Sequence, residues 1–287
     1  MIAGLTVRNF KSIRLIERLP LERFHVLIGP NASGKSTFLD VMEFVRDCLL
    51  FGPREAVEKR VPRFRDLTFM RQGGVVEVEF WLDMGKELVS LPESLLCYRL
   101  AIREDTRLGV SIEDEVLKQY PKRRLQPGKR LEFASGTTPR RLLGKTSKNN
   151  YYYQRESRKY QDTFTFGMEK PALSFTPPDE ARYPTANAVK QFLMQGIRYI
   201  QLNSRAMTRP CPATSPVELQ LDGSNLARVV GYLLGKNNGT DKTVDDYDRR
   251  GAIKRWTNHL RYAMDDIKEI GWEKRDSAAV VRRIICH

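Results

Sequence analysis

Along the first half of the chain, apolar and polar residues alternate over several short segments, with the period of two that is typical of half-buried β-strands. The pattern covers residues 2–9, 75–82, 96–104 and 110–117. No helical pattern separates the last two segments, which favours antiparallel pairing over βαβ units. We therefore expect an antiparallel, β-rich part in this half of the chain.

A different pattern covers residues 24–49. Residues 24–28 form a short run, Phe-His-Val-Leu-Ile, of the kind that suits a buried central parallel strand. Apolar residues then recur three and four positions apart, which marks one buried face of a helix. These residues are Phe38, Val41, Met42, Val45, Cys48 and Leu49. A buried strand and an amphipathic helix are therefore expected on either side of residues 29–37.

From Pro171 onwards the spacing becomes mainly helical. Amphipathic helices are expected at residues 186–194 and 245–270, with a strand at residues 197–203. The inner face of the last helix is expected to hold Ile253, Trp256, Leu260, Tyr262, Met264 and Ile267. Together the patterns predict a mixed α/β protein, with an antiparallel β-rich insertion and a helical C-terminal part.

Residues 29–37 fit the phosphate-binding template G-x-x-x-x-G-K-[ST], and the expected strand and helix are the context that this template requires. Gly29 and Gly34 allow the backbone to point N–H groups at phosphate oxygens, and the helix N-terminus adds its positive dipole end. Lys35 is expected to reach the β- and γ-phosphates, Ser36 to bind Mg²⁺, and Thr37 to make a further phosphate contact. The candidate residues are Gly29, Pro30, Asn31, Ala32, Ser33, Gly34, Lys35, Ser36 and Thr37. The sequence therefore predicts a P-loop NTPase core with a nucleoside triphosphate site.

The composition is that of an ordinary soluble globular protein with one large domain or two small ones. Hydrophobic residues make up 41% of the 287 positions and charged residues 29%. No apolar run reaches the length of a membrane span, and the N-terminus predicts a strand rather than a signal peptide. The cysteines are scattered and predict reduced, mostly buried thiols. They are Cys48, Cys97, Cys211 and Cys286. A cytoplasmic location is therefore expected.

The net charge of +14 favours a polyanionic partner. Most of this charge lies in residues 121–160, where twelve Lys and Arg stand against two Glu, a net charge of +10. Residues 151–153, all tyrosines, and Tyr160 lie among these cations, so the stretch suits DNA or another nucleic acid whose bases stack on aromatic rings. The best candidates for nucleic-acid contacts are Arg123, Arg124, Arg140 and Arg141. A solvated basic insertion without a partner is the alternative that the sequence leaves open.

One acidic cluster has the composition of a metal site. It consists of Glu113, Asp114 and Glu115, within the expected strand 110–117. Charged residues are common on the exposed edge strands of sheets. The preferred interpretation is therefore an edge-strand charge cluster rather than a metal site.

The stretch Asn9-Phe10-Lys11-Ser12-Ile13 ends the first expected strand, and about fifteen residues separate it from the loop at 29–37. This pair of motifs resembles the N-terminus of RecF/SMC-type ABC ATPase heads, a group that includes proteins called AAA family ATPases and relatives of OLD nucleases and antiphage systems. Residues 221–230 also resemble a segment of these heads. In that segment Asp222 or Ser224 would cap the following helix.

The resemblance implies an ATP phosphohydrolase that uses ATP and Mg²⁺, with Lys35 as its catalytic lysine. It places Asn9, Phe10 and Lys11 beside the nucleotide. Gln72 is the candidate for the glutamine that senses Mg²⁺ and the γ-phosphate in these heads, with an exposed turn glutamine as the alternative. The implied parts are a P-loop lobe at 1–95, a β-rich basic insertion at 96–170 and an incomplete helical part at 171–287. Such heads dimerise around ATP, which couples the nucleotide state to DNA or to an effector protein.

The sequence departs from these heads in one respect. Hydrolysis requires a strand of apolar residues that ends in Asp-Glu, but no run of four apolar residues is followed by such a pair. The signature motif, the Walker B strand and the switch histidine of family heads follow the last helix expected here. The resemblance therefore implies a fragment, or a chain that a homodimer or a partner protein completes. A hydrolysis-deficient ATP-sensing scaffold or truncated pseudo-ATPase is the alternative function, and a P-loop kinase is a third.

Overall fold

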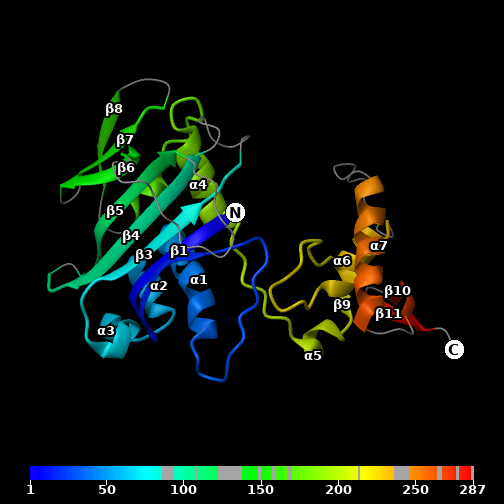
Figure 1. Ribbon diagram of the computed structural model, residues 1–287. Coiled ribbons are helices and arrows are strands. Elements are labelled where there is room, and N and C mark those ends of the chain that lie inside the picture. The colour runs from blue at the N-terminus through cyan, green and yellow to red at the C-terminus, as the bar shows by residue number, and fades with distance from the viewer. Residues whose placement is uncertain are drawn as a thin grey trace. The chain divides into compact units, whose positions relative to one another are not determined.

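The computed structural model describes residues 1–85, 94–107, 109–121, 138–147, 150–156, 160–166, 170–212, 214–235, 246–263, 267–275 and 278–285. The chain divides into two compact units, an N-terminal unit (Met1–Ile197) and a C-terminal unit (Arg198–His287). Each unit contains its own β-sheet (Figure 1). The mixed α/β class expected from the sequence is confirmed.

An eight-stranded sheet forms the centre of the N-terminal unit, in the order β2-β1-β3-β4-β5-β6-β7-β8. Every neighbouring pair in it is antiparallel. The strands are β1 (Ile2–Phe10), β2 (Ile13–Pro20), β3 (Val76–Leu82), β4 (Ser94–Asp105), β5 (Gly109–Pro121), β6 (Arg140–Ser147), β7 (Asn150–Gln154) and β8 (Gln161–Thr165). The four strands expected from alternation are thus confirmed. Because β3 pairs directly with β4, one sheet spans the first two expected parts, and the three-part division of an ATPase head stays a prediction.

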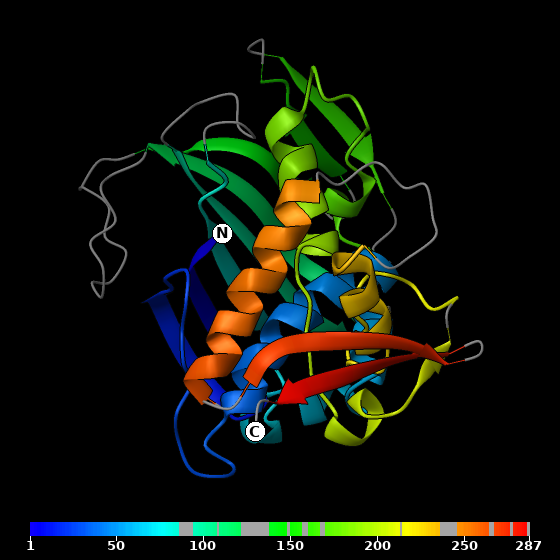
Figure 2. The ribbon, with the colours of Figure 1, turned by 90° about the vertical axis from the view of Figure 1, so that its right-hand side faces the viewer.

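Helices cover one face of this sheet (Figures 1 and 2). They and the short turns between them are α1 (Lys35–Phe51), α2 (Pro53–Glu58), α3 (Phe64–Leu67), η1 (Phe69–Arg71), η2 (Ala172–Phe175) and α4 (Pro184–Gln195). The helix expected after residue 37 is confirmed, and its apolar face is buried apart from the half-buried Met42. The expected helix at 186–194 is confirmed as α4. One core cluster joins the inner faces of the helices to the sheet.

The expected strand at residues 24–28 is not formed, which corrects the prediction. The segment follows β2 as an irregular stretch, with Phe24 80% and Ile28 91% exposed. An apolar run indicates a tendency to be buried but does not specify a pairing partner. Both edges of β1 are already occupied, by β2 and β3, so the segment cannot join the sheet beside β1. Among the described residues, no parallel strand pair forms.

Three tyrosines expected to stack on nucleic-acid bases are buried instead. Tyr151, Tyr152 and Tyr153 lie on β7, between β6 and β8. The hydroxyl of Tyr153 donates a hydrogen bond to the carbonyl of Ala172 (2.5 Å). Because all three side chains are buried, their rings cannot serve as an exposed stacking platform. Tyr160, by contrast, is exposed.

The C-terminal unit contains helices and a three-stranded antiparallel sheet, in the order β10-β11-β9 (Figure 2). Its elements are α5 (Ser204–Met207), β9 (Cys211–Pro212), α6 (Leu226–Leu233), α7 (Asp246–Ala263), β10 (Ile267–Arg275) and β11 (Ala278–Ile285). The expected helix 245–270 therefore ends earlier, at Ala263, and the C-terminal part contains a small sheet in addition to its helices. Half-buried Ile253, Trp256 and Leu260 lie on α7. The side chains of Tyr262, Met264 and Ile267 lie outside the description.

Two further expectations for the C-terminal half are corrected. Residues 197–203 form no strand, although the N–H groups of Gln201 and Asn203 donate to the carbonyls of Leu221 and Asp222 (both 2.9 Å). The N-cap position of α6 is occupied by Asn225, not by Asp222 or Ser224. The Asp222 carboxylate instead accepts from the Ser224 N–H within the preceding turn (3.0 Å), the local competition that is typical of aspartate.

Cys48, Cys97 and Cys211 are free, buried thiols, as expected, and Cys286 lies outside the described residues. Burial raises the pKa of the Cys48 and Cys97 thiols well above the ordinary value. Within the part of the chain that the structure describes, no helix combines the length and the apolar character that crossing a bilayer requires.

Candidate functional site

An exposed loop leads from Gly29 into the N-terminus of α1. Gly34 occupies the N-cap position with φ 91°, a left-handed conformation that glycine adopts without strain. A Cβ atom at this position would lie 3.3 Å from the Ser12 hydroxyl oxygen. No side chain caps this end of the helix, and its first regular hydrogen bond is donated by Phe38 N–H to Gly34 (2.9 Å). The first-turn N–H groups and the positive dipole end are thus available to an anion.

The ammonium group of Lys35 folds back over this loop. It donates hydrogen bonds to the carbonyls of Gly29 (2.7 Å) and Pro30 (2.6 Å), and lies 3.4 Å from the Ser33 hydroxyl. All three acceptors are neutral and belong to the loop itself. Since a charged oxygen attracts an ammonium group more strongly than a carbonyl does, a phosphate entering the loop would compete well for Lys35.

The turn that ends β1 lies against α1. The Ser12 hydroxyl donates to the Thr37 hydroxyl (3.2 Å), and Lys11 forms an ion pair with Asp40 (2.6 Å). Phe10 is fully buried, with its ring 5.1 Å from that of Phe44 on α1. The structure thus brings the turn and the loop together, but it places Phe10 in the core rather than at the surface.

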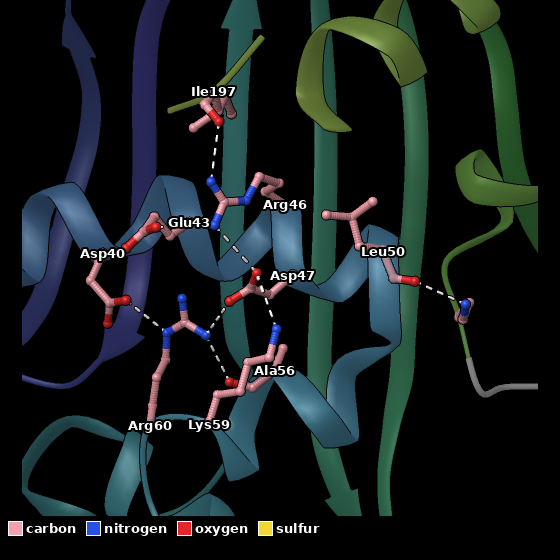
Figure 3. A network of polar contacts seen from close by, with 10 residues as sticks. Asp40, Glu43, Arg46, Asp47, Leu50, Ala56, Lys59, Arg60 and Ile197 are labelled. Carbon is pink, nitrogen blue, oxygen red and sulfur yellow. Dashed lines mark hydrogen bonds and ion pairs between the residues drawn. The ribbon is translucent and has the colours of Figure 1, made fainter. Parts of the chain in front are cut away.

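An ion-pair network fixes the middle of α1 (Figure 3). The guanidinium of Arg60 donates to Asp40 (2.7 Å), to Asp47 (2.9 Å) and to the carbonyl of Ala56 (2.9 Å). Burial lowers the pKa of Arg60, but the two carboxylates outweigh it, so the net effect is a raised pKa. Lys59 lies 3.7 Å from Asp47. Sequence reasoning missed this network, although Asp40 and Asp47 are two helical turns apart and hence on one face of α1.

A second polar contact of α1 reaches the end of the N-terminal unit. Arg46 donates to the Glu43 carboxylate (3.0 Å) and to the carbonyl of Ile197 (3.2 Å) (Figure 3). The helix that begins at the loop is therefore fixed along its length by polar contacts as well as by its apolar face.

Gln72 lies in an exposed turn that is tied to β1 through Asn9. The Asn9 amide donates to the carbonyls of Gly73 (2.9 Å) and Val75 (3.1 Å), and its oxygen accepts from the Phe69 N–H (2.9 Å). Asn9 is therefore bonded to residues on both sides of Gln72, and the turn after Asn9 contacts α1 through Ser12.

The acidic cluster on β5 is not on an edge strand, which corrects the prediction, because β5 lies between β4 and β6. Glu113 forms an ion pair with Arg103 (2.8 Å), and Asp114 forms one with Arg99. Glu115 is fully buried. The described residues contain no group of three or more His, Cys, Asp or Glu that could hold a metal ion. Ser36, the candidate ligand of Mg²⁺, lies at the exposed start of α1.

Two of the four arginines expected at a nucleic-acid interface are described. Arg140 on β6 donates to the carbonyls of Arg155 (3.3 Å) and Glu156 (3.2 Å), and Arg141 is exposed. Arg123 and Arg124 lie outside the described residues. Arg140 is thus engaged within the fold, and Arg141 forms a side-chain hydrogen bond with Tyr152.

Comparison with known proteins finds a match over the N-terminal part of the chain. The family model described as AAA ATPase domain matches residues 1–173, and no curated protein is similar to this chain. A solved structure from work described as "Structural biochemistry of ATP-driven dimerization and DNA stimulated activation of SMC ATPases" is 23% identical, over 43% of this chain and 72% of its own. Its TM-score of 0.30 is too low to support an argument. The family match covers more than half of the chain, including the turn at Asn9 and the loop at 29–37, and the chain therefore belongs to the AAA ATPase domain family.

Proposed function

We propose that this chain binds ATP with Mg²⁺ at the loop 29–37, and that it acts as an ATPase head of the RecF/SMC, ABC-like kind. The observation that supports this most directly is the geometry of Lys35. Its ammonium group rests on neutral carbonyls of an exposed loop, at the uncapped N-terminus of a long helix. Such a loop suits a polyphosphate, because the helix dipole, the free N–H groups and one mobile cation all act on the same small volume.

In this proposal four residues of the loop 29–37 have defined tasks. Lys35 leaves the carbonyls of Gly29 and Pro30 and moves to the β- and γ-phosphate oxygens. The N–H groups of the loop and of the first helical turn bind the phosphates, with Gly34 providing the left-handed turn. Ser36 would hold Mg²⁺, which when bound neutralises charge on the phosphates. Thr37 is oriented by its hydrogen bond from Ser12.

Hydrolysis needs a carboxylate to orient the attacking water, and the sequence has no apolar strand that ends in Asp-Glu. Two forms of the proposed function follow. In the first, a carboxylate from outside residues 1–287, on the same or another polypeptide, completes the site, and ATP turnover appears only with it. In the second, the chain senses ATP and scaffolds a partner without turnover. The amount of phosphate released by the purified chain distinguishes them.

The experiment that tests the proposal is calorimetric titration of the chain with ATP and Mg²⁺. The wild type is expected to bind, and Lys35→Ala to lose about tenfold or more in affinity, the effect of about 1.4 kcal/mol of lost charge-assisted bonding. Lys254→Ala, on the exposed face of α7, removes a lysine elsewhere and is the control. Equal affinities for all three proteins would contradict the proposal. Light scattering with and without ATP shows whether the nucleotide drives dimerisation.

We propose further that ATP binding is coupled to engagement of DNA through the basic stretch 121–160. The support is its charge of +10, with Arg141 exposed on β6. DNA affinity should then fall steeply with salt, and Arg123→Glu with Arg124→Glu should flatten that dependence. Arg107→Glu with Arg209→Glu makes the same charge change at exposed sites outside the stretch. A salt slope that both double variants reduce alike would contradict a specific interface.

A further inference from the structure

The side chain of Asn9 joins the turn after β1 to the loop 69–75. Its oxygen accepts a hydrogen bond from the Phe69 N–H (2.9 Å), and its nitrogen donates to the carbonyls of Gly73 (2.9 Å) and Val75 (3.1 Å). Both amide hydrogens are thereby used. The orientation of the carboxamide is also fixed, because exchanging its O and N would set the oxygen against two carbonyls. Both polar atoms of the Asn9 side chain therefore form hydrogen bonds to the loop 69–75.

Both segments hold backbone conformations that are unusual for residues with a side chain. In the turn after β1, Asn9 has φ 60° and Lys11 has φ 49°; in the loop, Met70 has φ 50° and Arg71 has φ 59°. Of the six described non-glycine residues with positive φ, these are four, and Ala32 in the loop 29–37 is a fifth. Such conformations persist only where surrounding contacts over-determine them, and they cluster at functional sites.

Further hydrogen bonds hold the loop 69–75 at its base, and backbone bonds of Arg71 and Gln72 to Thr68 and Phe69 order its exposed tip. Lys11 N–H donates to the carbonyl of Leu67 (2.6 Å), and the Thr68 hydroxyl accepts from Gly73 N–H (2.8 Å). At the tip, Met70 is 72% exposed and Gln72 is exposed. On its other side, the turn after β1 touches α1 through Ser12. This turn therefore bridges the start of α1 and the loop that carries Gln72.

We propose that Asn9 is a positioning residue that holds the loop 69–75 beside the triphosphate site, rather than a ligand of the nucleotide. The inference rests on the proposed function, since it assigns the loop 29–37 to a nucleoside triphosphate. We infer that nucleotide binding at the loop 29–37 and the order of the loop 69–75 are coupled through the turn at residues 9–12. Gln72 is presented to the triphosphate only while Asn9 keeps its three hydrogen bonds.

Hydrogen exchange of the amides in residues 69–75, measured with and without ATP and Mg²⁺, tests this link. Asn9→Asp keeps an acceptor for Phe69 but sets an oxygen against the carbonyls of Gly73 and Val75. Exchange in the loop is expected to quicken about tenfold or more even without nucleotide, because the part-buried bond to Gly73 and the exposed bond to Val75 are both lost. ATP is expected to slow exchange in the wild-type loop and to have little effect in the variant.

The C-terminal unit offers a matched control. The carboxamide of Asn225 makes the same three-bond pattern, donating to Pro216 and Glu218 (both 2.7 Å) and accepting from Gln220 N–H (2.8 Å). Asn225→Asp should quicken exchange at residues 216–220 and leave residues 69–75 unchanged. If Asn9→Asp does not fold, Thr68→Val removes the acceptor of Gly73 N–H and is expected to loosen the same loop.

Loss of ATP affinity in Asn9→Asp, with exchange in residues 69–75 as in the wild type, would overturn the inference and make Asn9 a direct ligand. Unchanged exchange without any loss of affinity would also overturn it. If the wild type bound no ATP, the proposed function would fail by itself, while the comparison without nucleotide would still decide whether Asn9 holds the loop.

Discussion

The substitution Glu115→Gln is expected to abolish a large pH dependence of stability in this protein. Glu115 is fully buried in the sheet, where its carboxyl group accepts from the Tyr98 hydroxyl (2.9 Å) and from the N–H groups of Ala172 (2.6 Å) and Leu173 (2.9 Å). It thereby fastens η2 to β5. Burial raises the pKa of this carboxyl group from 4.5 to about 7, against the three hydrogen bonds, which lower it.

The sign and size of the effect follow from this pKa. Below pH 4.5 the carboxyl group is protonated in both the folded and the unfolded chain, and its contribution to stability is complete. As the pH rises the unfolded chain ionises first, so the free energy of unfolding falls, and the loss is complete above a pH of about 7. One pKa unit corresponds to about 1.4 kcal/mol, so the total loss is about 3 kcal/mol.

Glutamine cannot ionise, but it fits the site imperfectly. Its carbonyl oxygen can replace the oxygen that accepts from Tyr98 and Leu173, whereas its NH₂ group faces the Ala172 N–H and leaves that donor unpaired. This costs roughly 2 kcal/mol at every pH. Glu115→Gln is therefore expected to be less stable than the wild type at pH 5 and about 1 kcal/mol more stable than the wild type at pH 8.

The assay is urea denaturation followed by circular dichroism at pH values from 5 to 8. The quantity of interest is the difference between the free energies of unfolding of the wild type and the variant, because the other titrating groups cancel in it. The reasoning is refuted if this difference stays constant with pH. It is also refuted if the difference grows towards pH 8, since that would mean that the three donors hold Glu115 ionised with a lowered pKa.

Three further substitutions test the contacts around α1 and α4, each against a control measured in the same way. Arg60→Ala is expected to lower the free energy of unfolding by roughly 3 kcal/mol, because the side chain is only 8% exposed and leaves Asp40 and Asp47 short of a partner. Arg54→Ala breaks an exposed ion pair and should leave the urea midpoint unchanged, so equal shifts would contradict the network in Figure 3. Glu156→Ala is expected to cost about 1 kcal/mol in urea denaturation, because this carboxylate caps α4 through the N–H and hydroxyl of Thr185; exposed Glu180→Ala should cost nothing measurable. Gly34→Ala and Gly109→Ala both place a Cβ at positive φ, but only Gly34 lies in the loop 29–37. Only Gly34→Ala should therefore lower ATP affinity, by about tenfold in calorimetry. Equal losses in the two variants would argue against an ATP site at this loop.

Alternation along the chain predicted the antiparallel strands well, because a strand with one buried face repeats its burial every two residues, whatever its neighbours are. The alternation does not, however, predict the order of the strands in the sheet. This is why the cluster at Glu115 was expected on an edge strand and is found inside the sheet. The run at residues 24–28 failed for the opposite reason, since its apolar character predicted burial but no strand beside β1 was left open to it.

The sequence likewise predicts some features of the candidate site and not others. The loop 29–37 is visible in the sequence because its chemistry is local: glycines, a lysine and a serine at fixed spacing. The partners of Asn9 and Arg60 are distant in sequence, and only the folded chain shows that Asn9 reaches Phe69 or that Arg60 joins Asp40 to Asp47. The end of α7 was misplaced because apolar residues of β10 continue its helical spacing by coincidence.

The exposed run at residues 24–28 has a practical consequence for the behaviour of the purified chain. An uncharged, β-prone segment without backbone partners is a template for strand pairing between molecules, the first step of aggregation. Arg23 and Pro30 flank it and limit how far such pairing can extend, as gatekeeper residues do. Because intermolecular pairing depends on concentration, solubility sets the upper limit for the titrations described above, and a lysine in place of Val26 would raise that limit.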